Sequence, residues 1–256
     1  MSERLRLFVI ALFWLIALQA GLGQQDRTLR IAAAADLEPV LPALMAEFHS
    51  QTGLNIEASY ASSATLATQI INGGPFDLFL SADMSFPQRV IDAGLADSAS
   101  PMPYAQGTLV LWARNDSPIQ NLSLDVLRAP SLGKVAVADA SHAPYGRAAK
   151  AAIESLGLTD ALKDKLVIAE NIAQTAQFVE SGNAEIGFIS LTSAVTPRLK
   201  SAGRYVEAPA SSYPPILQGA VVIKNSSHRD EAHKFLDFLG SATARSQLSE
   251  RGLKAP

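Results

Sequence analysis

Short runs typical of β-strands alternate along this chain with segments whose apolar side chains recur at helical spacing. Residues 29–34 form the first run, and residues 37–48 carry apolar side chains at intervals of three and four, with Gly53 just beyond them. Runs at 55–60 and 77–81 are each followed by a helical segment that stops at glycine. Three alternations of this kind predict βαβ units and a largely parallel sheet.

A second series begins after Gly107 and is interrupted by consecutive prolines at 214 and 215. Its predicted strands are 108–114, 134–138, 166–169 and 186–189, and its predicted helices are 147–156, 159–163 and 175–181. One more strand, 217–223, precedes two terminal helices, 229–239 and 242–251. Because the strand near 108 and the break near 214 resemble two crossings between lobes, we expect two α/β lobes. Lobe I comprises residues 27–108 plus 216–256, and lobe II comprises residues 109–215.

The N-terminal segment has the layout of a secretory signal peptide. Arg4 and Arg6 precede an apolar run at residues 7–18, and small residues follow it. We expect residues 1–25 to be cleaved, between Ala20 and Gln25. A membrane anchor is the alternative, but the run is short for a bilayer span. The chain has no cysteine, so we expect no lipid anchor and a soluble, exported protein.

Charge and cysteine content restrict the partners of the mature protein. The formal net charge is −3, and removing residues 1–25, which hold two Arg and one Glu, changes it to −4. A negative chain of this kind is a poor partner for nucleic acid. Any anion that binds here is therefore not attracted by the overall charge. Without disulfides, the core depends on apolar burial alone.

Four junctions between a predicted strand and the helix after it share a composition of small or hydroxyl residues. They are Ala35-Asp36, Ser62-Ser63, residues 142–146 and residues 170–172. Helix N-termini expose unpaired N–H groups and a partial positive charge, which can hold an oxyanion without Lys or Arg. Each junction alone is more simply explained by helix capping, worth about 1 kcal/mol. Four such junctions, two in each lobe, favour a binding site.

The sequence offers little for catalysis. The four histidines, at 49, 142, 228 and 233, have no metal-binding spacing, and no nucleophile elbow, phosphate loop or kinase signature occurs. Asp77 and Asp83 flank a strand end, where two carboxylates are more often solvated caps than a catalytic pair. We therefore expect a binding protein with no catalytic residues, and a secreted hydrolase remains the alternative.

Five segments of the chain resemble the periplasmic molybdate-binding proteins of ABC transporters. They are AAAADL, SYASSATLATQI, NGGPFDLFLSAD, SHAPYGRAA and AEIGFISLTSA, and they keep the order and spacing of that family. The resemblance implies a type II periplasmic-binding-protein fold, with two lobes of mixed sheet flanked by helices and a hinge of two crossings. It also implies one molybdate or tungstate in the cleft, no cofactor, no protein ligand to the metal itself, and a monomer that delivers its ligand to an inner-membrane ABC permease. Sulfate or phosphate on the same fold is the alternative.

The resemblance assigns five oxyanion-binding positions. Ser63 matches a family serine that offers its hydroxyl and N–H, and Ile172 matches an apolar position that contributes its backbone N–H. Asp36 replaces the family's frequent Ser or Thr, so we expect its side chain to cap the helix or only its N–H to face the anion. Tyr145 and Ser190 differ from some members in residue type, and we expect the Tyr145 phenol to reach the oxyanion as a neutral donor.

Overall fold

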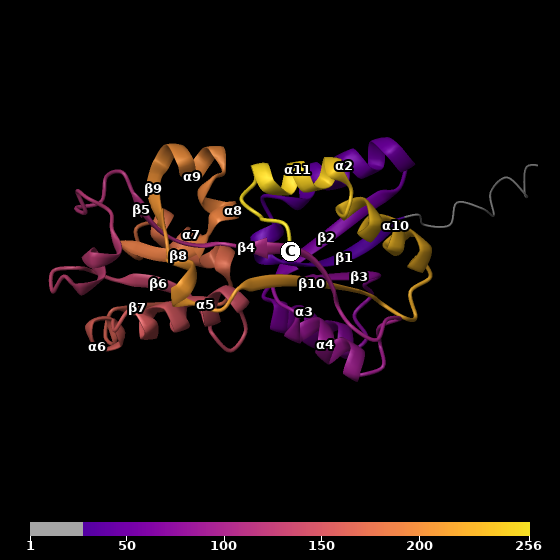
Figure 1. Cartoon of the computed structure of the whole chain (residues 1–256), viewed down its shortest axis with the longest axis horizontal. Coiled ribbons are helices and arrows are strands. Elements are labelled where there is room, and N and C mark those ends of the chain that lie inside the picture. Colours follow the sequence, from indigo (N-terminus) through magenta and orange to yellow (C-terminus); the bar gives the residue numbers. More distant parts are fainter. Residues whose placement is uncertain (1–27) are drawn as a thin grey trace, which may run out of the picture.

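The computed structural model describes residues 28–256, which form two lobes side by side, each built on a five-stranded sheet (Figure 1). The predicted signal peptide at residues 1–25 lies outside the described residues. Within residues 28–256, no helix is both long enough and apolar enough to cross a membrane.

The first sheet has the strand order β2-β1-β3-β10-β4. The bounds are Thr28–Ala34 for β1, Asn55–Ala61 for β2, Leu78–Ser81 for β3, Met102–Gly107 for β4 and Ile216–Val222 for β10. β1 is parallel to β2 and β3, whereas β10 is antiparallel to β3 and β4. The sheet is therefore mixed, as the family resemblance implies, because the strand that returns from the second lobe enters it in the opposite direction.

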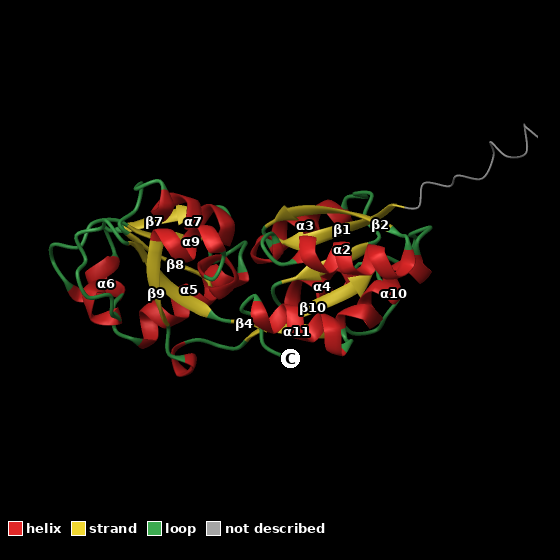
Figure 2. Ribbon diagram, turned by 90° about the horizontal axis from the view of Figure 1, so that it is seen from above, coloured by secondary structure: helices red, strands yellow, loops and turns green. Residues whose placement is uncertain are grey.

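Five α-helices cover the two faces of this sheet (Figure 2). They are α2 (Leu41–Thr52), α3 (Ser63–Ile71), α4 (Ser85–Asp92), α10 (Arg229–Leu239) and α11 (Ala242–Glu250). Alternate residues of β1 separate the faces: Ile31 packs with α2, α10 and α11, and Ala32 packs with α3 and α4. The ring of Phe48 in α2 lies 5.1 Å from that of Phe235 in α10, so the C-terminal segment completes the first lobe's core.

The second sheet has the order β7-β6-β8-β5-β9 and is also mixed. Its strands are β5 (Leu109–Arg114), β6 (Val135–Ala138), β7 (Leu166–Ala169), β8 (Ile186–Ser190) and β9 (Gly203–Glu207). The helices of this lobe are α5 (Pro144–Ser155), α6 (Thr159–Leu162), α7 (Ile172–Glu180), α8 (Leu191–Ala194) and α9 (Pro197–Ala202). Short 3₁₀ helices, η1 (Ala35–Leu37), η2 (Leu124–Arg128) and η3 (Ala210–Ser212), join the other elements.

The chain passes between the sheets at two places that lie close together. β4 ends at Gly107 and β5 begins at Leu109, while η3 leads back to β10 at Ile216. The N–H of Leu109 donates to the Tyr213 hydroxyl at 3.1 Å, which ties the two crossing segments to each other. We propose that the lobes divide at these crossings, after residues 108 and 215, and that the crossings form the hinge.

Sequence and structure differ at the edges of the sheets and at the starts of helices. The sequence does not predict β4 or β9, both of which are edge strands. Their sequences, MPYAQG and GRYVE, have no continuous apolar run, unlike the edge strand β7, LVIA, which was predicted. Helices α5 and α7 also begin three residues before their predicted starts, at Pro144 and Ile172. Both early turns belong to the junctions that the sequence marks as candidate sites.

Gly146 allows the first turn of α5 to lie directly against the end of β6. A Cβ atom at this position would be 2.5 Å from the carbonyl oxygen of Ala138. We expect Gly146→Ala to push α5 away from the sheet and to lower the free energy of unfolding by about 1–3 kcal/mol. Urea unfolding measures this, with the exposed Lys150→Ala on the same helix as control. Equal stability of Gly146→Ala and the native protein would contradict the close packing.

Candidate functional site

Four helix N-termini meet around one small cavity between the two lobes. Each helix start contributes at least two residues to its lining. These pairs are Ala35-Asp36 of η1, Ser62-Ser63 at α3, Pro144-Tyr145 of α5 and Asn171-Ile172 at α7. The four junctions that the sequence marks are thus brought together, two from each lobe.

The cavity offers hydrogen-bond donors without a cation. Among residues 28–256, the backbone N–H groups of Ser63, Tyr145 and Ile172 have no acceptor, as expected in the first turn of a helix. No Lys, Arg or His lines the cavity. The donors and the partial positive charge of the helix starts are therefore what the site presents to a ligand, and both favour an anion.

Ser62 and Ser63 divide two tasks at the start of α3. The Ser62 hydroxyl caps the helix by accepting from the N–H of Thr65 at 3.2 Å. Ser63 is the first residue of the helix, and its hydroxyl oxygen accepts from the N–H of Ala82 at 3.1 Å. Among the described residues, the Ser63 hydroxyl has no acceptor for its own hydrogen, so it can donate into the cavity.

Asp36 is fully buried in η1, at 0% exposure. Its Oδ2 accepts from the Tyr145 hydroxyl at 3.1 Å and from Nε2 of Gln218 at 2.5 Å, while its Oδ1 has no partner among residues 28–256. Burial raises the pKa of Asp36 from 3.8 to about 7, and the hydrogen bonds from Gln218, from Tyr145 and from its own backbone N–H oppose this rise. Of the two alternatives expected for Asp36, capping by its side chain is wrong, because neither η1 nor α2 has a side-chain cap. The other alternative, that only its N–H faces the anion, stays open at this point.

Tyr145 reaches Asp36 from the other lobe. Its ring is buried in α5, and burial together with the Asp36 carboxylate raises the pKa of its phenol well above 10.0. Gly107, at the end of β4, makes room for it, since a Cβ there would be 2.2 Å from the Tyr145 hydroxyl. In this structure the phenol donates to Asp36, so what it adds to the cavity directly is the backbone N–H.

Ser190 is not brought to the cavity with the other four predicted residues. It caps α8, and its hydroxyl oxygen accepts from the N–H of Ser193 at 3.3 Å and lies 2.8 Å from Thr192 Oγ1. Its side chain is thereby held against its own helix. Ile172 does lie at the cavity, at the start of α7, where Asn171 caps the helix through the N–H of Gln174 at 3.0 Å.

Two residues near the site were not identified from the sequence. Gln218 of β10 is fully buried, and it holds Asp36. Thr192 of α8 donates from its hydroxyl to the backbone carbonyl of Asp36 at 2.8 Å, across the lobes. A lone glutamine inside the apolar strand ILQGAVV is the signal that could have pointed to Gln218, because a buried amide needs a partner.

Further contacts hold the lobes together beside the cavity. Arg147 of α5 pairs with Asp83 in the first lobe, and its guanidinium carbon lies 5.2 Å from the centre of the Phe86 ring. The N–H of Ala64 donates to the carbonyl of His142 at 3.1 Å. The cavity is therefore enclosed by two lobes in contact.

A family model described as "Bacterial extracellular solute-binding protein" matches residues 29–254. The chain belongs to this family.

Named relatives cover almost the whole of this solute-binding protein. The molybdate-binding protein ModA of Azotobacter vinelandii is 32% identical over 240 residues, covering 93% of this chain and 95% of the relative. ModA of Rhodobacter capsulatus is 33% identical over 243 residues, with 95% and 93% covered. The solved periplasmic molybdate-binding protein of A. vinelandii superposes with a TM-score of 0.84 at 30% identity, covering 89% of this chain and 99% of that one.

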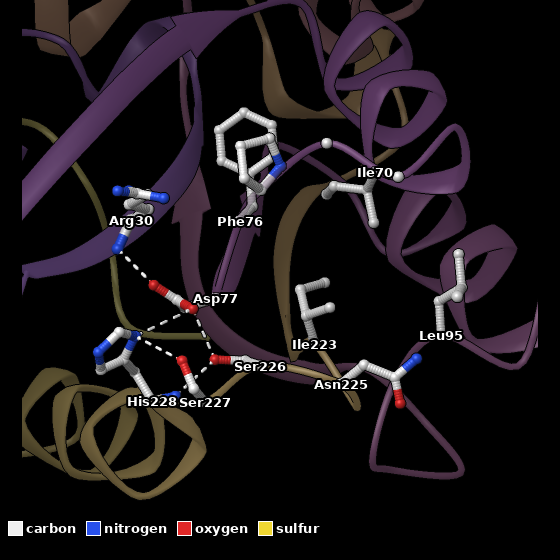
Figure 3. A pocket seen from close by; sticks show the side chains of 13 residues that line it. Arg30, Ile70, Phe76, Asp77, Leu95, Ile223, Asn225, Ser226, Ser227 and His228 are labelled. Carbon is white, nitrogen blue, oxygen red and sulfur yellow. Dashed lines mark hydrogen bonds and ion pairs between the residues drawn. The ribbon is translucent and has the colours of Figure 1, made fainter. Parts of the chain in front are cut away.

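A hollow of about 480 Å³ lies at the opposite end of the first sheet of this solute-binding protein, and Figure 3 shows its lining from close by. Asp77 lines it, and its carboxylate accepts from the N–H of Arg30 at 2.7 Å and from the Ser226 hydroxyl at 2.6 Å. Asp77 thus ties β1 to the loop after β10. Asp83 instead accepts from the N–H of Phe86 at 3.1 Å. The two aspartates make separate structural contacts, and Asp77 is buried rather than a solvated cap.

Within residues 28–256, no cluster of three His, Asp or Glu side chains could hold a metal ion. The donors at the cavity are N–H and hydroxyl groups rather than metal ligands. Its chemistry therefore suits an oxyanion bound through its oxygen atoms.

The raised pKa of Asp36 affects stability. Between about pH 4 and pH 7 the folded state holds a proton that the unfolded state has lost, so stability falls as pH rises through this window and then levels off. Above about pH 7 the ionised Asp36 lowers the free energy of unfolding by about 4 kcal/mol. We expect Asp36→Asn to be more stable than the native protein at pH 8, with most of the gain absent at pH 4.

Urea unfolding at both pH values measures this difference for the unliganded protein. Asp92→Asn, on the exposed surface of α4, is the matched control and is expected to change stability equally at both. An equal effect of Asp36→Asn at pH 4 and pH 8 would show that Asp36 titrates normally.

Proposed function

We propose that this protein captures molybdate, or the similar tungstate, in the periplasm and delivers it to an inner-membrane ABC permease. The observation that carries the proposal is a small cavity ringed by four helix N-termini and free of cations. The relatives named as molybdate-binding proteins support the choice of anion. In this proposal the protein is an exported monomer that binds its ligand without a cofactor and catalyses no reaction.

Fixed neutral donors can select a tetrahedral dianion by size. Molybdate and sulfate carry the same charge, so charge cannot separate them. Donors spaced for the longer metal–oxygen bond make stretched, weaker hydrogen bonds to sulfate. Hydrogen phosphate brings its own hydrogen, which needs an acceptor, and a buried polar group without one costs about 1–3 kcal/mol. A mobile Lys or Arg would attract all of these anions and weaken the selection.

Sulfate or phosphate on the same fold is the second candidate ligand. The sulfate-binding protein SubI of Mycobacterium tuberculosis has a TM-score of 0.75 at 17% identity, a likeness that concerns the fold alone. The partly paired Asp36 is the feature of the cavity that favours phosphate, since an ionised carboxylate can accept a hydrogen bond from a protonated anion.

Titration calorimetry with molybdate, tungstate, sulfate and phosphate tests the ligand. We expect tight binding of molybdate and tungstate, and much weaker binding of the other two. Tight binding of phosphate without molybdate would overturn the assignment. Turnover of an ester substrate would favour the hydrolase alternative.

Ser63 and Ser62 form a matched pair for testing the site. We expect Ser63→Ala to remove one hydrogen bond to the charged ligand, worth about 1.5–3 kcal/mol, which corresponds to about tenfold to over a hundredfold in affinity. Since Ser63 also accepts from the N–H of Ala82, this variant should lose some stability as well. Ser62→Ala should lose about 1 kcal/mol of stability, the value of a cap, with a smaller loss of affinity. Calorimetry measures the loss of anion affinity, and thermal unfolding measures the loss of stability. Equal anion affinity of both variants would show that Ser63 does not bind the anion.

Closure of the lobes is the conformational part of the proposal. A ligand shifts the equilibrium toward the closed form only by its greater affinity for that form. The Arg147–Asp83 pair, which joins the two lobes, also stabilises the closed form. We expect Arg147→Ala to weaken molybdate binding severalfold and to make the unliganded protein more extended in small-angle scattering. Lys150→Ala, one turn away on α5, is the control. Native affinity and an unchanged radius of Arg147→Ala would indicate that this pair does not contribute to closure.

A further inference from the structure

Asp36 is the one acidic residue in the lining of the cavity. Every other residue that contributes to that lining is Ala, Ser, Pro, Tyr, Asn or Ile. The two oxygens of the carboxyl group are in different situations. Oδ2 has two hydrogen-bond donors, whereas Oδ1 is buried and without a partner in the described part of the chain. A polar atom in that position needs either a hydrogen of its own or a ligand that supplies one.

The groups that face Asp36 from the surrounding elements are neutral. The phenol of Tyr145 from α5 and the amide of Gln218 from β10 donate hydrogen bonds to its carboxyl group. The hydroxyl of Thr192 from α8 donates to its backbone carbonyl. Tyr104 of β4 is close enough to sense its charge, and the Tyr104 hydroxyl donates to the carbonyl of Ser81.

Helices α3 and α7 present only neutral residues to the same cavity, namely Ser62, Ser63, Asn171 and Ile172. Arg147, which joins the two lobes, already pairs with Asp83. No ionised neighbour contributes to the titration of Asp36. The carboxylate therefore lacks a positive partner that could offset its charge next to a bound anion.

A dianion and an ionised carboxylate are incompatible in this cavity. Like charges repel strongly at a few ångströms when water is excluded, and this repulsion favours the protonated acid. A neutral carboxyl group has one O–H donor. Because Oδ2 already accepts two hydrogen bonds, the hydrogen belongs on Oδ1, the oxygen without a partner.

We propose that Asp36 binds the captured dianion as a neutral carboxylic acid, donating a hydrogen bond from Oδ1, so that capture of one anion takes up one proton from solvent. The inference rests on the proposed function and names how one residue of that site works. The balance is simple: an ionised Asp36, one proton and one dianion give a complex in which the carboxyl O–H points to an anion oxygen.

Burial already raises the pKa of Asp36 to about 7 before any ligand is present. A dianion in the cavity raises this pKa further, since it disfavours the carboxylate. Below about pH 7 the acid is ready for the ligand, and above that pH each binding event must take a proton from solvent. Affinity for the dianion therefore falls as pH rises above about 7, approaching tenfold per pH unit.

The neutral acid also sharpens the selection against hydrogen phosphate. With Asp36 protonated, the cavity contains a further donor and loses the acceptor that the phosphate hydrogen would need. An ionised Asp36 would do the opposite and favour phosphate. The protonation state of this one side chain thus decides between the two candidate ligands.

Calorimetry of the purified protein with molybdate, at about pH 6 and about pH 8.5, tests the inference. Each titration is made in two buffers of different ionisation enthalpy, which counts the protons taken up. For the native protein we expect close to one proton per anion at the higher pH, close to none at the lower pH, and more than tenfold weaker binding at the higher pH.

Asp36→Asn places an amide donor where the acid hydrogen would be, so its affinity for molybdate should differ little between the two pH values, and it should bind without proton uptake. Asp92→Asn should keep the native pH dependence. Tyr145→Phe removes a hydrogen bond that stabilises the carboxylate, so its loss of affinity should begin at a higher pH. Infrared spectra at the higher pH should gain a protonated-carboxyl band when molybdate is added to the native protein, but not to Asp36→Asn.

The outcomes separate the inference from the function on which it rests. Absence of molybdate binding at both pH values overturns the proposed function and the inference with it. Equal molybdate affinity at both pH values without proton uptake overturns the inference alone. Tight phosphate binding that Asp36→Asn abolishes also overturns it, because it means that an ionised Asp36 accepts the hydrogen of the anion.

Discussion

Unpaired backbone N–H groups at the starts of α3, α5 and α7 are the constraint around which this molecule is arranged. A buried N–H without an acceptor is costly, and the described residues leave those of Ser63, Tyr145 and Ile172 without one. Two of the four helix starts belong to each lobe, so the donors form one cage only when the lobes meet. Closure and ligand binding are therefore aspects of the same geometry, because an anion between the lobes satisfies both sides.

The contacts between the lobes differ in how directly they depend on a ligand. Arg147 pairs with Asp83 at the rim, and the N–H of Ala64 is satisfied by the carbonyl of His142. Asp36 and Tyr145 instead meet inside the cavity, where the same atoms that join the lobes also border the ligand. A carboxyl group in that place connects three properties that are usually separate: the stability of the fold, the closure of the lobes and the charge that the site tolerates.

Much of the fold was readable from the sequence because its central strands are apolar throughout and each is followed by a helix. β7 and α10 have the predicted bounds, and the four site junctions follow from the same alternation. The edge strands β4 and β9 were not predicted because MPYAQG and GRYVE have no continuous apolar run, whereas β7, also at an edge, has one. Of the five predicted site residues, Asp36, Ser63, Tyr145 and Ile172 lie at one cavity and Ser190 does not. A serine before a helix gives the same local signal whether it caps that helix, as Ser62 and Ser190 do, or faces a cavity, as Ser63 does.

The sequence by itself determined the two α/β lobes, the helix starts that surround the cavity and the absence of a cation at those starts. All three follow from local patterns, in which the spacing of apolar and small residues fixes an element and its ends. Only the tertiary structure decided the partners of Asp36, which are Tyr145 at a separation of 109 residues and Gln218 at a separation of 182. These contacts arise because β10 returns to the first sheet and because the second lobe closes on it. Whether a buried carboxyl group is solvated, paired or left with one free oxygen depends on that closure, and no local pattern encodes it.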